Sequence, residues 1–292
     1  MIPFIPITRF APSPTGYLHL GHVANALYVW GLAERHGGSV LLRIEDHDRQ
    51  RSKPAYERAI LTDLEWLGLS WSSMVRQSDR DREYRGRLAR LADRFNVYTC
   101  SCSRRDLARE AADVPGEEMR YPGHCRHRGL PPRAGHGVRV ELKAGEIRFS
   151  DLLLGEQRQD PSLQCGDLQL KDRLGNWTYQ FAVTVDDYLQ GVNLIVRGQD
   201  LLASTGRQIL LGEMLGRPEP ATFFHHPLIL KPGGDKLSKS SGDTGVRELR
   251  AAGESRETVL GHAAFLAGLQ KEQRPISPAE IGRLFLTTLE AG

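Results

Sequence analysis

The sequence contains no apolar run close to the roughly 20 residues that a membrane-spanning helix needs, so it predicts no transmembrane segment. A signal peptide is not expected either, because the apolar residues 1–7 are few and carry no basic segment. They predict a first buried strand instead. Internal repeats and low-complexity tracts are also lacking, which excludes a repeat architecture. We therefore expect a cytoplasmic globular protein of one or two domains, with no membrane contact.

Cysteine and lysine are both scarce. Of the four cysteines, Cys100, Cys102 and Cys125 cluster while Cys165 stands apart. In an intracellular enzyme such a cluster is more typical of a metal site than of disulfides. Arginine greatly outnumbers lysine, and the net charge is +3 with a pI near 8.7. This balance fits a nucleic-acid partner without requiring one. The arginine surplus is explained equally by phosphate binding or by a GC-rich genome.

The apolar pattern at the N-terminus predicts a β-α-β unit. Residues 2–10 are strand-like, residues 18–36 have helical spacing that ends at two glycines, and residues 39–44 form a continuous apolar run. Such a unit predicts a right-handed crossover in a doubly wound parallel sheet. Further helices are expected at 54–67 and 80–94.

Changes in amino-acid composition then divide the chain into four parts. Cys, Arg, Gly and Pro accumulate after Asn96, short β-like runs follow, and apolar sheet texture returns at 192–196. We predict an α/β fold with a Rossmann-type catalytic domain, an inserted zinc-containing α+β domain and a small helical C-terminal element. The predicted spans are 1–96 and 188–245 for the two catalytic halves, 97–187 for the insert and 246–292 for the helical element.

A first motif occupies the predicted turn from strand to helix, from Arg9 to His22. Helix N-termini offer unpaired N–H groups to anions, and Gly16 and Gly21 permit a ligand to approach closely. His19 and His22 are three residues apart and so share one helix face, where two imidazoles could stabilise charge on an attacked phosphate. The alternative is a packed turn with two surface histidines.

A second motif, residues 235–241, follows Gly233 and Gly234. Lys236, Lys239 and three hydroxyls could surround a polyphosphate. An exposed basic loop is the alternative, and it would be preferred if the first motif were missing.

Together these motifs resemble the two signatures of class I aminoacyl-tRNA synthetases. The segment from Arg9 to Gly16 is similar to the opening of glutamyl- and glutaminyl-tRNA synthetases. So is the segment from Leu42 to Asp48, in which His47 stands where that family usually has threonine. The resemblance covers about residues 5–245.

The resemblance implies a role for each matching residue. Arg9 and Ser13 would bind glutamate, Glu45 its ammonium group, Tyr179 would line the pocket and Arg197 would hold a carboxylate. Two arginines and one carboxylate complement the charges of glutamate, although ordinary salt bridges at strand ends are the alternative. The implied ATP-binding residues are His19, Gly21, His22, Lys236, Ser238 and Lys239, of which His19, His22 and Lys239 would be catalytic.

The cysteine cluster has the pattern Cys100-x-Cys102, then Tyr121-x-x-x-Cys125. Three thiolates and one further ligand would form a closed, structural zinc site. Tyr121, His124 and His127 are the candidates for the fourth ligand, and chemistry alone favours a histidine. The pattern is similar to the insert of glutamyl-queuosine-tRNA(Asp) synthetases, which implies Tyr121. Metal-free cysteines are the alternative, and Cys165 is expected to be a small apolar filler.

The same resemblance implies the activity. It predicts activation of L-glutamate by ATP with Mg²⁺, then transfer to queuosine in the anticodon of tRNA(Asp), by a monomer. Residues 246–292 would suffice for two or three helices but not for an anticodon-reading domain. Three alternatives are a truncated glutamyl-tRNA synthetase charging the 3′ end of tRNA(Glu), a catalytically silent RNA-binding regulator, and a generic nucleotidyltransferase.

Overall fold

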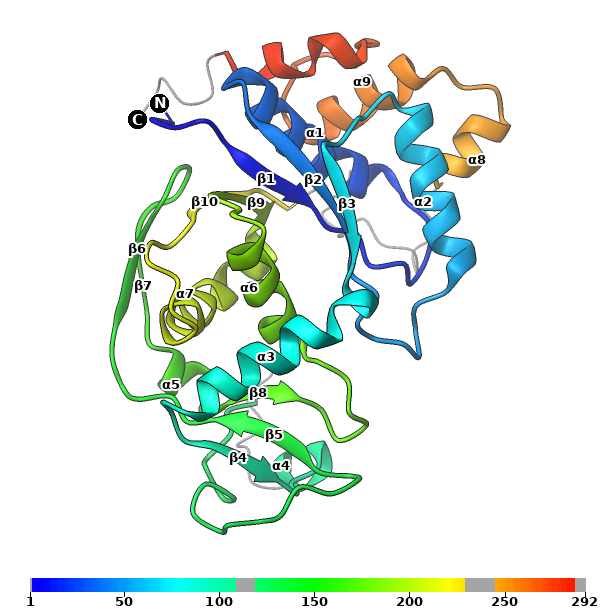
Figure 1. The fold of residues 1–292 in the computed structure, drawn as a ribbon. Helices are drawn as coiled ribbons and strands as arrows, with labels where there is room; N and C mark the ends of the chain where they lie inside the picture. The colour runs from blue at the N-terminus through cyan, green and yellow to red at the C-terminus, as the bar shows by residue number, and fades with distance from the viewer. Residues whose placement is uncertain (1, 109–118, 229–244, 287–292) are drawn as a thin grey trace.

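The computed structural model describes residues 2–108, 119–228 and 245–286 (Figure 1). The second motif, with Lys236, Ser238 and Lys239, lies outside these residues.

A parallel three-stranded sheet forms the first half of the catalytic core. It consists of β1 (Ile7–Phe10), β2 (Ser39–Ile44) and β3 (Ser73–Arg76), in the order β1-β2-β3. Helix α1 (Leu20–Arg35) joins β1 to β2, and α2 (Pro54–Trp66) joins β2 to β3. The β-α-β unit expected from the sequence is thus confirmed. Its apolar strands are covered on both faces, as is usual for parallel strands.

The second half is a four-stranded sheet in the order β7-β6-β10-β9. Strands β9 (Leu194–Gly198) and β10 (Thr222–His226) are parallel, β6 (Ile147–Asp151) pairs parallel to β10, and β7 (Gly155–Gln159) is antiparallel to β6. The two sheets meet at β1 and β9. There the backbone N–H of Ile7 donates to Asn193 Oδ1 (2.7 Å), and the Asn193 N–H donates to Ile7 O (3.0 Å).

The span 97–187 contributes to two sheets. Strands β4 (Val97–Cys100), β5 (Gly137–Val140) and β8 (Leu168–Lys171) form a separate antiparallel sheet. Helices α3 (Asp81–Ala92), α4 (Arg104–Ala108) and α5 (Pro161–Gln164) lie near it. Strands β6 and β7 join the catalytic sheet instead, because Phe149 packs on Phe223 of β10 with ring centroids 5.7 Å apart.

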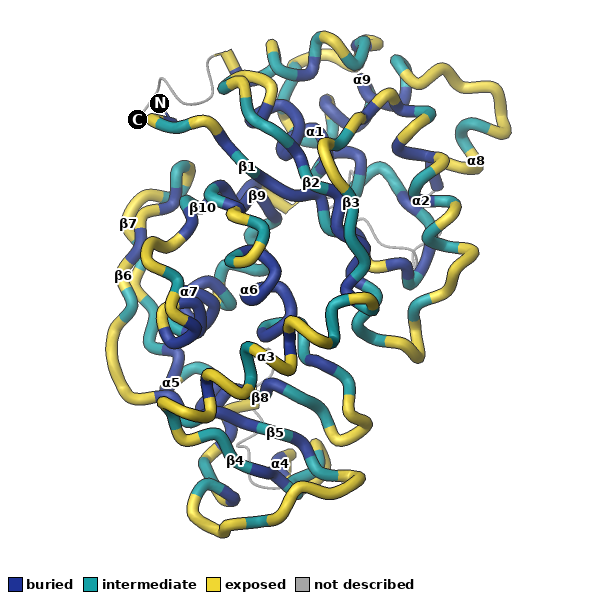
Figure 2. The backbone as a smooth tube through the Cα atoms, in the orientation of Figure 1, coloured by how far each residue is buried: buried dark blue, intermediate teal, exposed yellow. Residues whose placement is uncertain are grey.

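Helices cover both faces of the catalytic sheets, as a doubly wound fold requires (Figures 1 and 2). Helices α1, α8 (Val246–Ala251) and α9 (Arg256–Leu266) and the 3₁₀ helix η4 (Pro278–Phe285) lie on one side. On the other side lie α6 (Tyr179–Leu189) and α7 (Thr205–Met214), which the 3₁₀ helix η2 (Gln199–Ser204) precedes.

Helix α1 and η4 approach each other closely. A Cβ on Gly31 would lie 2.1 Å from Cε2 of Phe285, so only glycine fits there. A further 3₁₀ helix, η1 (Gln77–Arg80), leads from β3 into α3. None of the helices in the described ranges has both the length and the apolar character that crossing a bilayer requires.

Candidate active site

Three charged side chains meet at the carboxyl edge of the joined sheets. Arg9 lies in β1, Arg197 lies in β9, and Glu45 directly follows β2. Their exposed fractions are only 5%, 4% and 6%, so each is buried. In open α/β sheets this edge is where ligands bind. The structure therefore brings together the three residues whose charges complement glutamate.

Two adjacent aspartates of α6 fix the residues around Arg9. Arg9 Nε lies 3.1 Å from Asp187 Oδ1, and the buried Arg43 donates to the same oxygen at 2.6 Å. Burial opposes ionisation of Asp187, but the two arginines outweigh it and keep its pKa below the usual value. Its neighbour Asp186 accepts from Gln77 (2.9 Å) and Tyr84 (2.8 Å), which ties α6 to η1 and α3.

Glu45 is the one carboxylate among the three. Burial raises its pKa to about 7, against the opposite pull of Arg43 and Arg9. Its backbone N–H donates to Pro12 O (3.1 Å), which fixes the β2–α2 connection to the loop of the first motif. A carboxylate at this depth favours a cationic partner, because a cation restores the solvation that burial removes.

Arg197 donates to three uncharged acceptors. Its Nε donates to His225 Nε2 (3.0 Å), one terminal nitrogen to Gln208 Oε1 (2.7 Å) and the other to Thr205 Oγ1 (2.8 Å). Burial lowers the pKa of Arg197. These neutral contacts orient the guanidinium without neutralising it, so its charge remains available to an anionic ligand.

His225 is itself oriented by a carboxylate. Its Nδ1 lies 2.7 Å from Asp151 Oδ2, and both side chains are fully buried. Burial lowers the pKa of His225, so the ring is neutral. Nδ1–H then donates to Asp151, which leaves Nε2 as the acceptor for Arg197. Sequence analysis did not identify the hydrogen-bonded series from Asp151 through His225 to Arg197, and it did not identify Asp186. The only available signal was two adjacent acids within the apolar pattern of α6.

The other predicted glutamate residues have different surroundings. Tyr179 begins α6 and is partly buried. Burial first, and Glu45 second, raise the pKa of its phenol, which places it beside the charged groups. Ser13 lies on the loop between β1 and α1 and is exposed.

The two histidines of the first motif lie at the N-terminus of α1, with ring centroids 3.9 Å apart. His19 Nδ1 accepts the N–H of Gly21 (3.1 Å), and His22 Nδ1 accepts the N–H of His19 (3.2 Å). Because both Nδ1 atoms accept, the proton of each neutral ring is assigned to Nε2, which makes Nε2–H a donor. The pair can therefore offer two donors, with the helix dipole, to an anion.

Both described flanks of the second motif contact the first motif or its helix. Before it, His226 stacks on Tyr28 of α1 (4.5 Å between ring centroids) and lies 2.9 Å from Asn25 Oδ1. After it, Gly245 forms a β-bridge with His19, and the next residue's N–H donates to Leu18 O (2.9 Å). The described chain thus ends against α1 before the second motif and resumes beside His19 after it.

The cysteine cluster lies at the end of β4, whose last residue is Cys100. The sulfurs of Cys100, Cys102 and Cys125 all lie within 4.8 Å of one another, and those of Cys102 and Cys125 are 3.6 Å apart. With Zn–S bonds of about 2.3 Å, a tetrahedral site places two sulfurs about 3.8 Å apart. The spacing of the thiols therefore fits a zinc ion.

Tyr121 is better placed than the histidines to be a fourth ligand. It is 2% exposed, and its hydroxyl lies 3.4 Å from Cys100 Sγ and 4.0 Å from Cys102 Sγ. Arg139 covers its ring at 3.8 Å. In contrast, His124 and His127 are exposed. Cys165 is buried in another apolar cluster, where its thiol donates to Pro161 O (3.2 Å).

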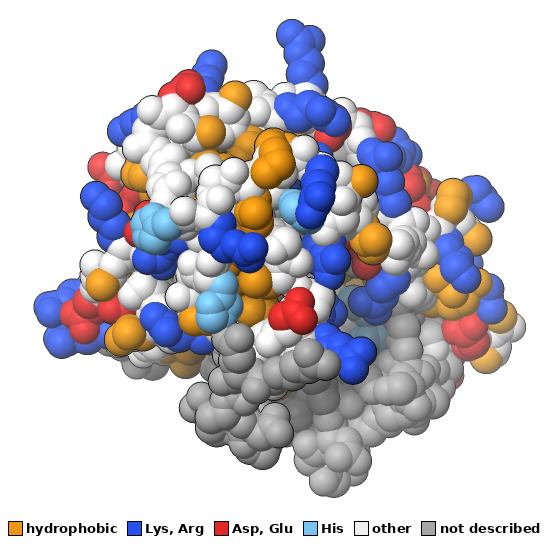
Figure 3. All heavy atoms as spheres, turned by 90° about the horizontal axis from the view of Figure 1, so that it is seen from below, with side chains coloured by type: hydrophobic (Ala, Val, Ile, Leu, Met, Phe, Trp, Pro, Cys, Tyr) orange, Lys and Arg blue, Asp and Glu red, His pale blue; other side chains and the backbone are white. Residues whose placement is uncertain are grey.

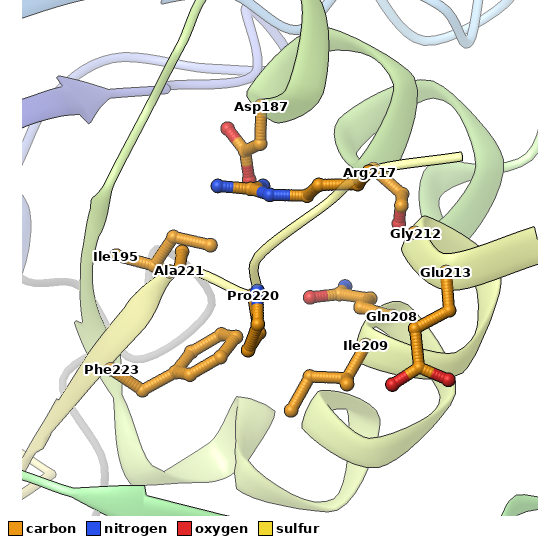
Figure 4. A pocket seen from close by; sticks show the side chains of 11 residues that line it. Asp187, Ile195, Gln208, Ile209, Gly212, Glu213, Arg217, Pro220, Ala221 and Phe223 are labelled. Carbon is orange, nitrogen blue, oxygen red and sulfur yellow. The ribbon is translucent and has the colours of Figure 1, made fainter. Parts of the chain in front are cut away.

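A small cavity lies behind the charged edge, between α6, α7 and β10 (Figure 4). Its volume is about 20 Å³, which is room for about one water molecule. Arg217 extends toward Asp187 there. This cavity lies behind the site and is too small for a substrate.

Comparison with known proteins agrees with this geometry. A family model described as the catalytic domain of class I tRNA synthetases (E and Q) matches residues 7–289. A glutamyl-Q tRNA(Asp) synthetase from Symbiobacterium thermophilum is 43% identical over 296 residues, covering 95% of this chain and 91% of that protein.

Longer proteins match as well. A glutamate–tRNA ligase from Oleidesulfovibrio alaskensis is 40% identical over 287 residues, and the match covers 96% of this chain but 61% of that protein. A crystal structure of a glutamate tRNA ligase from Elizabethkingia meningosepticum, in complex with its amino acid, superposes with a TM-score of 0.79 at 28% identity. That match covers 96% of this chain and 64% of the other.

Proposed function

The chain belongs to the class I tRNA synthetases (E and Q), and from this premise we propose that it activates L-glutamate with ATP and transfers the glutamyl group to queuosine in the anticodon of tRNA(Asp). The observation that carries the proposal is the convergence of Arg9, Glu45 and Arg197 at one sheet edge. The name of a relative that the chain matches over 91% of its length supports the choice of RNA.

The first step forms glutamyl-adenylate. An oxygen of the glutamate α-carboxylate attacks the α-phosphorus of ATP, the bond to the β-phosphate breaks, and pyrophosphate leaves with Mg²⁺. Glu45 would pair with the substrate ammonium, while Arg9 and Arg197 would hold its carboxylates, with Tyr179 as a wall. Such charge pairs position the nucleophile and exclude substrates of other charge.

The nucleotide would lie at the start of α1. His19 and His22 would donate from Nε2 to the α-phosphate as charge grows on it, and the N–H of Gly21 already fixes the first ring. Lys236, Ser238 and Lys239 are proposed from the sequence as further phosphate contacts. Ser13 is proposed as a glutamate contact.

The second step transfers the glutamyl group. A hydroxyl oxygen of the RNA attacks the carbonyl carbon of the adenylate, and the bond to the phosphate oxygen breaks. AMP leaves, and the hydroxyl proton departs with it. An RNA partner suits the face at the β4-β5-β8 end, over which Lys and Arg side chains are spread (Figure 3). Arg104, Arg105, Arg128 and Arg133 are exposed in this part of the chain.

We propose one structural zinc ion held by Cys100, Cys102, Tyr121 and Cys125. The sulfur spacing and the buried Tyr121 hydroxyl support this set. A four-ligand site has no open position for a substrate, so the metal would hold the loop after β4 together and take no part in catalysis.

The test of function compares three RNAs. Labelled glutamate should be transferred, with ATP, to tRNA(Asp) that contains queuosine, and not to tRNA(Asp) without it or to tRNA(Glu). Charging of tRNA(Glu) at its 3′ end would show instead the activity in the names of the longer relatives. The lack of any glutamate-dependent ATP–pyrophosphate exchange would overturn the proposal altogether.

A further inference from the structure

A larger cavity lies beside the glutamate site, and its lining includes none of the residues proposed to bind glutamate or ATP. Its volume is about 300 Å³, which is large enough for a small ligand. Three segments enclose it: the β2–α2 connection, η1 with the start of α3, and the turn between β8 and α6. Its basic lining residues are Arg49, Arg85 and Lys171, and Leu174 and Trp177 are among the others.

The cavity borders the proposed glutamate pocket on two sides. His47, in its wall, is two residues after Glu45, and its ring centroid lies 6.4 Å from that of Tyr179. Trp177, also in the wall, is two residues before Tyr179. His47 is held in place by Gln77, at 2.6 Å between Nδ1 and Oε1. A molecule in the cavity would therefore lie next to the bound amino acid.

The rim combines cations with an exposed aliphatic side chain. Lys171 lies over the Trp177 ring at 4.5 Å, and the Trp177 indole N–H donates to Asp81 Oδ1 (2.9 Å). Leu174 is 69% exposed on the β8–α6 turn, and Asp172 fixes that turn by accepting the N–H of Leu174 (2.9 Å). A rigid turn that presents an apolar side chain to solvent offers a contact surface for a ligand.

These features together match one ligand class. Cations at the rim suit phosphodiesters, which dominate binding to nucleic acids. An apolar contact suits the flat face of an unstacked base, and RNA bases are usually recognised in this splayed-out form. ATP has its own proposed cradle at His19 and His22, and glutamate has its own at Arg9 and Arg197. The remaining reactant of the proposed function is the accepting nucleoside.

We propose that this cavity receives the accepting nucleoside of the RNA, with its base against Leu174 and its flanking phosphates beside Arg49, Arg85 and Lys171. This inference rests on the proposed function. It assigns the transfer step to a surface that the activation step does not use, so the two steps can be separated by substitution.

The experiment uses two matched pairs of variants. Arg85→Glu is compared with Arg82→Glu, because both arginines are exposed on α3 and only Arg85 lines the cavity. Leu174→Asp is compared with Leu163→Asp, because these side chains are 69% and 67% exposed and only Leu174 lines the cavity. All four positions are exposed, so the variants should fold. Arg85 also pairs with Asp81, at 2.5 Å between Nε and Oδ2, so Arg85→Gln is included as the variant that removes the cation without placing a second carboxylate beside Asp81.

Two activities are measured on each variant: glutamate-dependent ATP–pyrophosphate exchange, and glutamate transfer to queuosine-containing tRNA(Asp). Arg85→Glu and Leu174→Asp should each lower kcat/KM for transfer about tenfold or more, with exchange changed less than about twofold. Both controls should retain both activities. The plot of log kcat/KM for transfer against log salt concentration has a negative slope. In Arg85→Gln this slope should become shallower by about 1.

The outcomes separate this inference from the function it rests on. Absence of exchange in the unsubstituted protein would defeat the proposed function. Normal exchange and normal transfer in both cavity variants would overturn the nucleoside site. An equal loss of exchange and transfer would also overturn it, because the cavity would then serve ATP or glutamate.

Discussion

Glutamate binding should weaken as the pH falls through 7, because the carboxylate proposed to pair with the substrate ammonium is buried. Burial raises the pKa of Glu45 from its ordinary value of 4.5 to about 7, while Arg43 and Arg9 pull the other way. The raised pKa means that the protonated form is favoured in the free protein below pH 7. Only the ionised form can pair with the ammonium, so protons compete with the substrate.

The size of the effect follows from the fraction ionised. With a pKa of about 7, Glu45 is about one-tenth ionised at pH 6 and about nine-tenths ionised at pH 8. The apparent Kd for glutamate scales inversely with that fraction, so it should rise about tenfold from pH 8 to pH 6. At pH 7, binding should also release about half a proton per glutamate.

Calorimetry without ATP measures both quantities and avoids the groups at the nucleotide site. Repeating the titration at pH 7 in buffers of different ionisation enthalpy gives the proton release. Two controls isolate Glu45. Glutarate has no ammonium group and should not bind more weakly in acid, and Glu45→Gln should lose the pH dependence. Equal glutamate Kd values at pH 6 and pH 8, or an unchanged pH dependence in Glu45→Gln, would show that Glu45 does not pair with the substrate ammonium.

Three further predictions concern other parts of the site. His225→Leu leaves the buried Arg197 Nε without its acceptor, so KM for glutamate in the exchange assay should rise about 5- to 150-fold; an unchanged KM would contradict the positioning role. Lys239→Ala should slow ATP–pyrophosphate exchange about 10²- to 10³-fold, and an unaltered rate would exclude Lys239 from the phosphate cradle. Cys125→Ser should abolish bound zinc, measured by elemental analysis, and lower the melting temperature. Cys165→Ser should keep the metal, and equal zinc in both variants would disprove the ligand set.

Local patterns in the sequence predicted local structure well. The strand expected at 39–44 is β2 to the residue, and the helices expected at 54–67 and 80–94 differ from α2 and α3 by one or two residues at their ends. Apolar periodicity and glycine or proline boundaries are set by neighbouring residues, so they can be seen in a single sequence. The resemblance to a known family, and not the apolar pattern, pointed to Arg9, Glu45 and Arg197, and their places at the ends of predicted strands agreed with it.

The contacts that orient these residues could not be found in the same way. Asp187 holds Arg9 across 178 positions of the chain, and Asp151 contacts His225 across 74. The pairing of β6 with β10 also depends on residues distant in the sequence, since Phe149 packs on Phe223. No local spacing encodes such pairs, and only the folded topology brings them together.

The two arginines of the site differ in a way that bears on substrate choice. Arg9 shares the Asp187 carboxylate with Arg43, so part of its charge is balanced before any ligand arrives. Arg197 donates to an imidazole, an amide and a hydroxyl, and Asp187, the carboxylate that favours its charged form, is already bound to Arg9 and Arg43. Its buried charge is therefore oriented but only partly balanced, which is costly, and an anionic ligand reduces that cost. Glutamate carries two carboxylates and one ammonium, a net charge of −1 that Arg197 can neutralise once Glu45 has paired with the ammonium. Glutamine has no second carboxylate and would leave Arg197 unbalanced. On this reasoning, the neutral cradle around Arg197 selects the acid over its amide.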